Sequence, residues 1–428
     1  MYATHFSLEL TKRCNLRCDY CYWEDHPELD CTFDYAKKVL DWVTTPAVSG
    51  DAKQVNISLF GGEPLLKYDL IHEIKAYAKT LTKQIKFGIT SNGTLLTPER
   101  IDWLVDNKVS VSPFSIDGAR LSHDMHRKNL VGQGSFDMLV KNLPYLLKRQ
   151  GRTTGRMTIT PTTIPYLAEN VRFLVEELGF ASVAAALVTD VPGATIPPWD
   201  EGALAIIEEQ YRLVEKWVGD RIVKRVPNPI AVSFLWKNAR NILKNTDLKS
   251  PCGAGRGYLG IANDGVYPCH RFTCWPEWRL GVVGGKLDEE KRDKFSKFNR
   301  ENNNLCRGCP NRFCGGNCYA ANYAVTGDPF KVDPIVCSMV ALLQQSAERL
   351  VAAHRADPYF QQQFIEKKPS GGNATDIATL ARRNQELVTR VARLEFRVAT
   401  LEKRPVVNAG NDSVDARTHN KKPCPNCP

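Results

Sequence analysis

Three cysteines near the N-terminus constrain this chain more than any other feature of its sequence. Cys14, Cys18 and Cys21 lie within eight residues, separated by three and then two positions. A purely structural cubane iron–sulfur cluster takes four thiolates, so three clustered thiols would leave one iron open to another ligand. Structural zinc sites usually pair a CxxC with a second, distant pair, and three inert buried cysteines tolerate any spacing. The spacing therefore favours a cluster with one open iron, with zinc or unreactive thiols as the alternatives.

Strand-like and helix-like stretches alternate over the first two hundred residues. The predicted strands are 5–10, 56–60, 86–90, 110–116, 157–160 and 183–188, and the predicted helices are 35–44, 67–81, 98–106, 135–150 and 168–178. Six strand–helix units predict parallel strands joined by right-handed crossovers. The three cysteines follow the first strand, and chemistry in barrels of parallel strands takes place in the loops after the strand ends.

The loops after the next strands also carry candidate ligand-binding residues. Gly61 and Gly62 follow the second strand and would let backbone approach a ligand, while Glu63 offers an acceptor for an ammonium group. Any tight turn would also use the two glycines. Further candidates lie after the third and fourth strands: Ser91, Asn92, Ser115, Asp117 and Arg127. Arg127 is equally well explained as a surface residue.

Taken in this order, the motifs resemble those of the radical S-adenosylmethionine (SAM) enzymes. The resemblance implies an α/β fold with an open, partial (β/α)6 barrel. It also implies that Cys14, Cys18 and Cys21 hold a [4Fe-4S] cluster whose open iron chelates SAM, and that one electron then yields a 5′-deoxyadenosyl radical. The implied SAM contacts are Tyr20, Gly61, Gly62, Glu63, Ser91, Asn92, Ser115, Asp117 and Arg127. No catalytic residue is assigned, and Asp117 is the candidate.

Eight more cysteines lie between residues 252 and 337, the number that two fully ligated cubanes require. Asn263-Asp264-Gly265 among them predicts a hairpin. The set resembles the SPASM extension of peptide-modifying radical SAM enzymes, which binds two auxiliary [4Fe-4S] clusters. The family's interleaved pairing implies one cluster on Cys252, Cys269, Cys318 and Cys274, and another on Cys306, Cys309, Cys314 and Cys337. The Gly265–Cys269 and Cys309–Cys314 gaps are each one residue shorter than usual, and structural zinc is the alternative.

Composition and charge limit the cellular compartment and the binding partners that we expect. Fourteen cysteines in clustered spacing indicate metal ligation rather than disulfides. The sequence has no run of about 18 apolar residues and no signal-peptide pattern, so we predict a cytoplasmic protein without a membrane span. The net charge is +10, but much of the basic excess falls after residue 376, so nucleic-acid binding is not expected.

The predicted organisation is a barrel over 1–200, a helical bridge over 201–250 that continues a helix at 199–218, an auxiliary-cluster domain over 251–355, a linker over 356–375, a coiled coil over 376–404 and a disordered tail over 405–428. In the coiled coil, Ile377, Asn384, Val391 and Val398 occupy position a and leucines occupy position d. This unbroken pattern favours a homodimer, although a single amphipathic helix packed on its own domain is an alternative. The tail carries Cys424 and Cys427, which suit a metal site, a redox pair or a fused substrate segment.

The resemblance implies a maturase that modifies a precursor peptide or protein made by the ribosome, with a flavodoxin- or ferredoxin-type electron donor. Its product would be a crosslink (a C–C cyclophane or a thioether) or a related oxidised residue. A sulfatase-type formylglycine maturase is the alternative within the class. A non-catalytic iron–sulfur or zinc scaffold, dimerised by the coiled coil, is the alternative from another class.

Overall fold

The computed structural model describes residues 1–23, 26–188, 196–303 and 305–364. All of them belong to one compact unit, Met1–Glu366. A second unit, Lys367–Pro428, lies outside the described residues. The predicted coiled coil and cysteine-containing tail fall within it and remain predictions.

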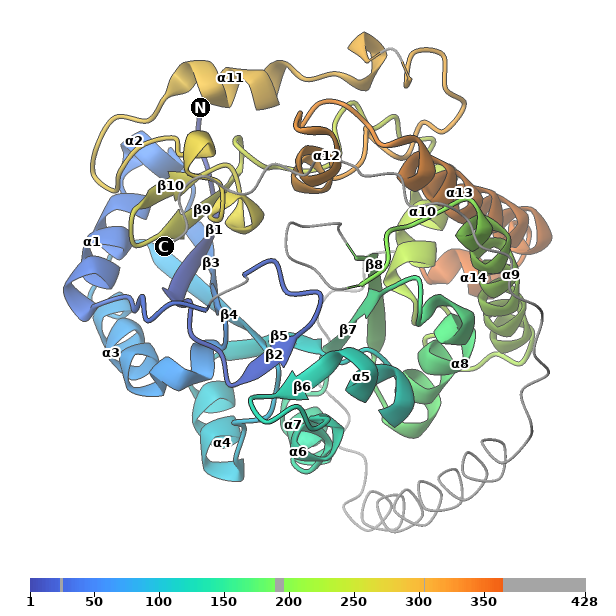
Figure 1. Ribbon diagram of the computed structural model, residues 1–428, viewed down its shortest axis with the longest axis horizontal. Coiled ribbons are helices and arrows are strands. Elements are labelled where there is room, and N and C mark those ends of the chain that lie inside the picture. The colour runs from blue at the N-terminus through green and yellow to red at the C-terminus, as the bar shows by residue number, and fades with distance from the viewer. Residues whose placement is uncertain (24–25, 189–195, 304, 365–428) are drawn as a thin grey trace, which may run out of the picture. The chain divides into compact units, whose positions relative to one another are not determined.

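A curved sheet runs through the unit, with strand order β10-β9-β1-β3-β4-β5-β7-β8 (Figure 1). Six of its strands are mutually parallel: β1 (His5–Thr11), β3 (Gln54–Gly61), β4 (Gln84–Ser91), β5 (Val109–Ser115), β7 (Thr154–Ile159) and β8 (Ser182–Leu187). These confirm the six predicted strands and the α/β fold with a parallel sheet. Their carboxyl ends meet at one edge, which is where loops carry chemistry in such folds.

The sheet extends beyond the six expected strands. β9 (Tyr258–Ala262) pairs in parallel with β1, and β10 (Gly265–Tyr267) pairs with β9 in antiparallel fashion, which confirms the predicted hairpin. The region of the later cysteines therefore begins as part of the barrel's own sheet. The predicted boundaries at residues 200 and 250 do not separate compact units.

Helices flank the sheet, and several begin at residues with capping side chains. Thr97 accepts a hydrogen bond from the backbone N–H of Arg100 at the start of α4 (Pro98–Asp106), as N-cap residues do. The predicted helix over 135–150 is two helices, α6 (Phe136–Val140) and α7 (Leu143–Gln150), because Pro144 cannot continue a helix and instead starts one. The others include α1 (Phe33–Val43), α2 (Pro46–Ser49), α3 (Tyr68–Ala78), α5 (Arg120–His126), α8 (Leu167–Arg172), α11 (Glu289–Lys297), α12 (Tyr319–Thr326) and α14 (Pro358–Gln362).

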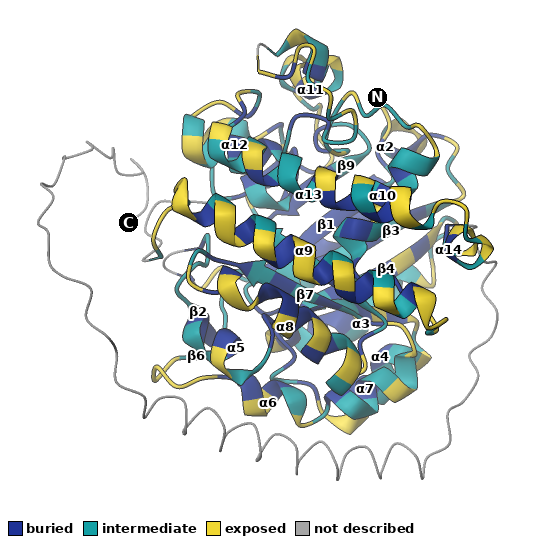
Figure 2. Ribbon diagram, turned by 90° about the vertical axis from the view of Figure 1, so that its right-hand side faces the viewer, coloured by how far each residue is buried: buried dark blue, intermediate teal, exposed yellow. Residues whose placement is uncertain are grey.

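Three helices pack together beside β8: α9 (Gly202–Val223), α10 (Ser233–Leu243) and α13 (Pro334–His354) (Figure 2). α9 starts later and ends later than the predicted helix 199–218. Within the described residues, α13 is the one helix long and apolar enough to cross a membrane by length and composition. Here it packs on α9, where Ser346 donates to the carbonyl of Tyr211 and Arg349 pairs with Glu215. These contacts hold α13 against α9, and 33% of its apolar stretch is buried.

Candidate active site

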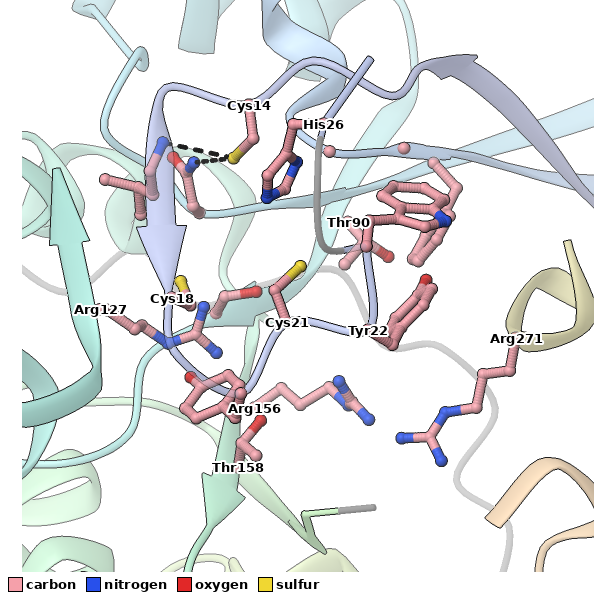
Figure 3. Close-up of a pocket in the computed structure, with 18 of the residues that line it drawn as sticks. Cys14, Cys18, Cys21, Tyr22, His26, Thr90, Arg127, Arg156, Thr158 and Arg271 are labelled. Carbon is pink, nitrogen blue, oxygen red and sulfur yellow. Dashed lines mark hydrogen bonds between the residues drawn. The ribbon is translucent and has the colours of Figure 1, made fainter. Parts of the chain in front are cut away.

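The N-terminal cysteine triplet, which is Cys14, Cys18 and Cys21, lies in the loop after β1 and lines one cavity (Figure 3). β2 (Leu16–Cys18) pairs with β6 (Arg127–Asn129), which places Cys18 opposite Arg127. The backbone N–H of Cys21 donates to the carbonyl of Cys18 over 2.9 Å. The structure thus brings together the three thiols that the sequence predicted to act as a set.

The environment of the triplet suits thiolates that bind metal. Burial raises the pKa of Cys14 and Cys18 to about 12 and also raises the pKa of Cys21, so the thiols would stay neutral without a bound cation. Asn92 Nδ2 and the Leu16 backbone N–H donate to Cys14 Sγ over 3.8 and 3.4 Å. Within the described ranges, no three His, Cys, Asp or Glu side chains surround a single-ion position. In a cubane each thiolate binds a different iron, so three neighbouring thiols fit a cluster with one open iron.

Asp117 and Arg127 form a buried ion pair beside the triplet. Arg127 donates from Nε and Nη2 to the two carboxylate oxygens over 2.8 and 3.2 Å. Tyr20 Oη and the Thr158 backbone N–H donate to the same carboxylate. Burial acts to raise the pKa of Asp117, but the charges of Arg127 and His123, together with the hydrogen bonds from Arg127 and Thr158, outweigh it, so the pKa lies below its usual value. Asp117 is therefore an ionised positioning residue rather than a proton acceptor. Asp117 does not line the cavity, whereas Arg127 does. Because the side chain of Arg127 is buried, Arg127 is not a surface residue.

Glu63 joins the loops that follow β3 and β4. Its carboxylate is fully buried and accepts hydrogen bonds from Leu65 N, Ser91 Oγ and Asn92 N over 3.0, 2.9 and 2.7 Å. Burial raises its pKa to about 7 despite these donors. Glu63 is not among the residues that line the cavity. Its observed role is to hold Ser91 and Asn92, and its predicted contact with an ammonium group stays a prediction.

Gly61 and Gly62 line the cavity and also allow a close approach between backbones. A Cβ on Gly61 would lie 2.3 Å from the carbonyl oxygen of Thr11, and one on Gly62 would lie 2.2 Å from that of Arg13. The two glycines therefore let the loop after β3 pack against the segment that leads into the triplet. This packing requires glycine whether or not a ligand is bound.

Most of the predicted SAM contacts surround one cavity with the triplet: Tyr20, Gly61, Gly62, Ser91, Asn92, Ser115 and Arg127. Sequence reasoning missed Arg156, Thr158 and Arg271, which also line it. Arg156 and Thr158 alternate with the buried Met157 on β7, so the period of two in the strand could have placed them on the inner face.

The later cysteines separate into two groups. The proximal group is Cys252, Cys269 and Cys318, and the distal group is Cys306, Cys309, Cys314 and Cys337. Burial raises the pKa of thiols in both groups, and within each group the charge of neighbouring thiols adds to that effect. The thiols within each group therefore act on one another, and their pairing into two clusters stays a prediction.

Cys274 is the fourth member of the proximal group in the predicted pairing. Its thiol donates to the carbonyl of Arg271 over 3.4 Å, and its charge acts on Tyr22 and Tyr323. It does not line the cavity that the proximal group lines. Its predicted role as the fourth ligand stays a prediction.

A second cavity, of about 610 Å³, adjoins the first. The proximal group lines it, together with side chains from β7, β8, α9, α10, α12 and α13. Arg156, Val188 and Arg271 line both cavities and so mark their junction. The triplet and the proximal group thus line two neighbouring cavities that share these three residues.

Comparisons with known proteins agree with this geometry. Residues 8–174 match the family model of the radical SAM superfamily. The chain is 24% identical over 349 residues to a serine-type anaerobic sulfatase-maturating enzyme of Bacteroides thetaiotaomicron, which covers 74% of this chain and 82% of that protein. It is 25% identical over 372 residues to an AdoMet-dependent heme synthase of Oleidesulfovibrio alaskensis, covering 80% and 88% of the two chains.

Among solved structures, native anSMEcpe with bound AdoMet and a Cp18Cys peptide has the same fold, with a TM-score of 0.66 at 17% identity and coverage of 82% of this chain and 98% of that one. Residues 8–174 therefore match the radical SAM superfamily, and the proteins similar to the chain include a sulfatase-maturating enzyme. A radical SAM domain implies a [4Fe-4S] cluster and SAM, and the triplet and its cavity fit both.

Proposed function

We propose that the protein removes a hydrogen atom from one residue of a ribosomally made peptide or protein and so installs a crosslink or a related oxidative modification. The observation that carries this proposal is the second cavity, which shares lining residues with the triplet cavity and has the size of a ligand site. The sulfatase-maturating relative and the peptide-bound structural neighbour support a peptide or protein substrate.

The lining of the second cavity suits side chains of a peptide. Its apolar part includes Leu187, Trp199, Phe234, Val340 and Leu343, which come from separate elements that converge on one space. Apolar walls with a few polar groups are typical of sites that bind and orient organic substrates. A substrate seated there would reach the triplet cavity past Arg156 and Arg271.

When bound, the cluster and SAM at the triplet would supply the 5′-deoxyadenosyl radical that breaks a carbon–hydrogen bond. The chain's own residues position the reactants. Asp117 fixes Arg127 beside Cys18, and Glu63 holds Ser91 and Asn92 at the cavity wall. The proximal and distal groups would hold two auxiliary clusters, and a flavodoxin- or ferredoxin-type protein would deliver electrons.

Formylglycine formation in a sulfatase is the second candidate, and the relative from Bacteroides thetaiotaomicron favours it. In that case a single Ser or Cys side chain would enter the triplet cavity and be oxidised without forming a link. The chain is also similar to a heme synthase. If no peptide is modified, a small-molecule substrate is therefore the next to test.

The deciding experiment follows hydrogen from substrate to cofactor. A candidate peptide deuterated at its non-exchangeable side-chain positions is incubated with reduced enzyme and SAM, and both products are analysed by mass spectrometry. We expect deuterium in 5′-deoxyadenosine, and a peptide that has lost two hydrogens and carries an internal link on fragmentation. The same loss at one Ser, without a link, would identify formylglycine formation.

The control is the variant with alanine at all three triplet cysteines, which should transfer no label. A peptide mass that is unchanged in ordinary water but rises by about one unit in deuterated water, through exchange at an α carbon, would indicate epimerisation instead of oxidation. If no peptide acquires a change and the label stays in place, a peptide-modifying function is wrong.

A further inference from the structure

Arg156 and Arg271 bring two guanidinium groups together where the two cavities meet. Arg156 lies on the inner face of β7, and Arg271 lies in the short helix η4 (His270–Phe272) that follows Cys269. Figure 3 shows both side chains extending into the same space, at the end of the cavity away from Cys14. Each lines both cavities.

Arg156 brings a positive charge to this junction that no described acidic side chain pairs with. Three arginines line the triplet cavity, and no Asp or Glu does within the described part of the chain. Arg127 is paired with Asp117, and Arg271 Nη1 lies 3.9 Å from Cys318 Sγ, to which it donates. The guanidinium of Arg156 makes no ion pair and no hydrogen bond with a described residue.

The position of the Arg156 guanidinium favours the binding of an anion. Burial, together with the charges of Arg271 and Arg127, lowers the pKa of Arg156, so the surroundings disfavour its charged form. A bound anion would offset this cost of a buried cation without a partner. A carboxylate is the best match, because its two oxygens fit the planar fork of a guanidinium in a bidentate pair.

We propose that Arg156, supported by Arg271, binds a carboxylate of the substrate. This inference rests on the proposed function and deepens it: the substrate peptide presents an acidic side chain, or its own C-terminus, close to the residue that loses hydrogen. Asp333 lines the second cavity and would repel a carboxylate there. The junction is therefore the position where the substrate's negative charge is accommodated, and Arg156 acts in specificity and positioning.

Binding of three small probes to the reconstituted holoenzyme, with SAM present and oxygen excluded, tests this inference by titration calorimetry. The probes are acetyl-Gly-Asp-Gly-amide, its neutral Asn counterpart, and the Asn peptide with a free C-terminal carboxylate. At least one acidic probe should bind about tenfold more tightly than the neutral one, which corresponds to ~1.4 kcal/mol. The tighter of the two acidic probes identifies the source of the carboxylate. Equal affinity for all three probes, or no binding of any, would overturn the inference.

Matched variants separate this role from a general effect on folding. Arg156→Gln should abolish the preference for the acidic probe, whereas Arg156→Lys should retain part of it, because lysine keeps the charge but loses the fork. The control is Arg152→Gln, an exposed arginine four residues earlier, which should bind like the wild type.

The carboxylate of SAM is the competing source, and its affinity is measured in the same variants. If Arg156→Gln weakens SAM binding while the preference for acidic probes persists, the partner is SAM and the inference is wrong. Because these titrations need no turnover, they do not depend on the label-transfer experiment. Acidic probes that bind through Arg156 without any peptide modification would leave the subsite standing and the proposed function refuted.

Discussion

Replacing Asp117 with Asn tests whether the buried pair with Arg127 organises the site. The substitution keeps the size of the side chain but removes its charge. It leaves the Arg127 guanidinium buried without a counter-ion, since the two side chains are 0% and 9% exposed. The remaining carbonyl oxygen also cannot serve all the donors that the carboxylate now accepts, which include Tyr20 Oη and the backbone N–H of Thr158.

Removing one partner of a buried pair costs about 3–5 kcal/mol in free energy of unfolding, so we expect a loss of ~3 kcal/mol for Asp117→Asn. The pH dependence has a definite sign. Because the pKa of Asp117 is lower in the folded state, its contribution to stability is complete at neutral pH. That contribution disappears as the pH falls below about 3.9 and through the folded-state pKa. The variant should lack this component of acid unfolding.

Equilibrium urea denaturation of the cluster-free protein measures the effect. Asp102→Asn is the matched control, because Asp102 pairs with Arg149 on the surface and such pairs contribute under about 1 kcal/mol. The double variant Asp117→Asn with Arg127→Gln should lose less stability than the two single losses combined, since the unpaired buried charge is gone. If Asp117→Asn costs no more than Asp102→Asn, the organising role of the pair is refuted.

Three further predictions concern the cysteines and the C-terminal unit. Wild-type protein should hold about twelve irons, and alanine at all three triplet cysteines should remove about four of them and abolish SAM cleavage. Iron analysis with detection of 5′-deoxyadenosine checks both, and persistent cleavage would contradict the assignment of the open iron. Alanine at Cys306 and Cys309 should stop product formation but spare uncoupled SAM cleavage, measured by chromatography; loss of both activities would point to a collapse of the fold. Leu387→Pro should convert a sedimenting dimer to a monomer, because proline breaks the predicted seam; a monomeric wild type at micromolar concentration would rule out self-pairing.

The parts of the fold that a local pattern encodes were predictable from sequence. Alternation of strands and helices located all six parallel strands, and Asn263-Asp264-Gly265 located the hairpin. The pairing of β9 with β1 was not predictable, because His5 meets Tyr258 across 253 positions of chain and no local signal records such a partner.

Prediction of the site from sequence met the same limit, because local patterns do not record distant contacts. Motif spacing identified the triplet and the glycines of the next loop, since each needs a particular residue type at a particular place. The roles of Glu63 and Asp117 depend on burial, and both carboxylates prove to be held by protein donors behind the cavity wall. Arg156 belongs to no motif, and only the fold shows that it faces Arg271.

The parallel pairing of β1 with β9 has a consequence for how the molecule could be divided. β1 leads into the triplet loop, and β9 leads through its hairpin to Cys269, so adjacent strands joined by backbone hydrogen bonds carry the two regions. A chain cut at residue 250 would leave the backbone N–H and carbonyl groups along one side of β1 unpaired, and a bare strand edge of this kind recruits other chains into aggregates. The two halves are thus not interchangeable modules, and the spacing between their cysteines is set by the rigidity of one sheet rather than by a hinge.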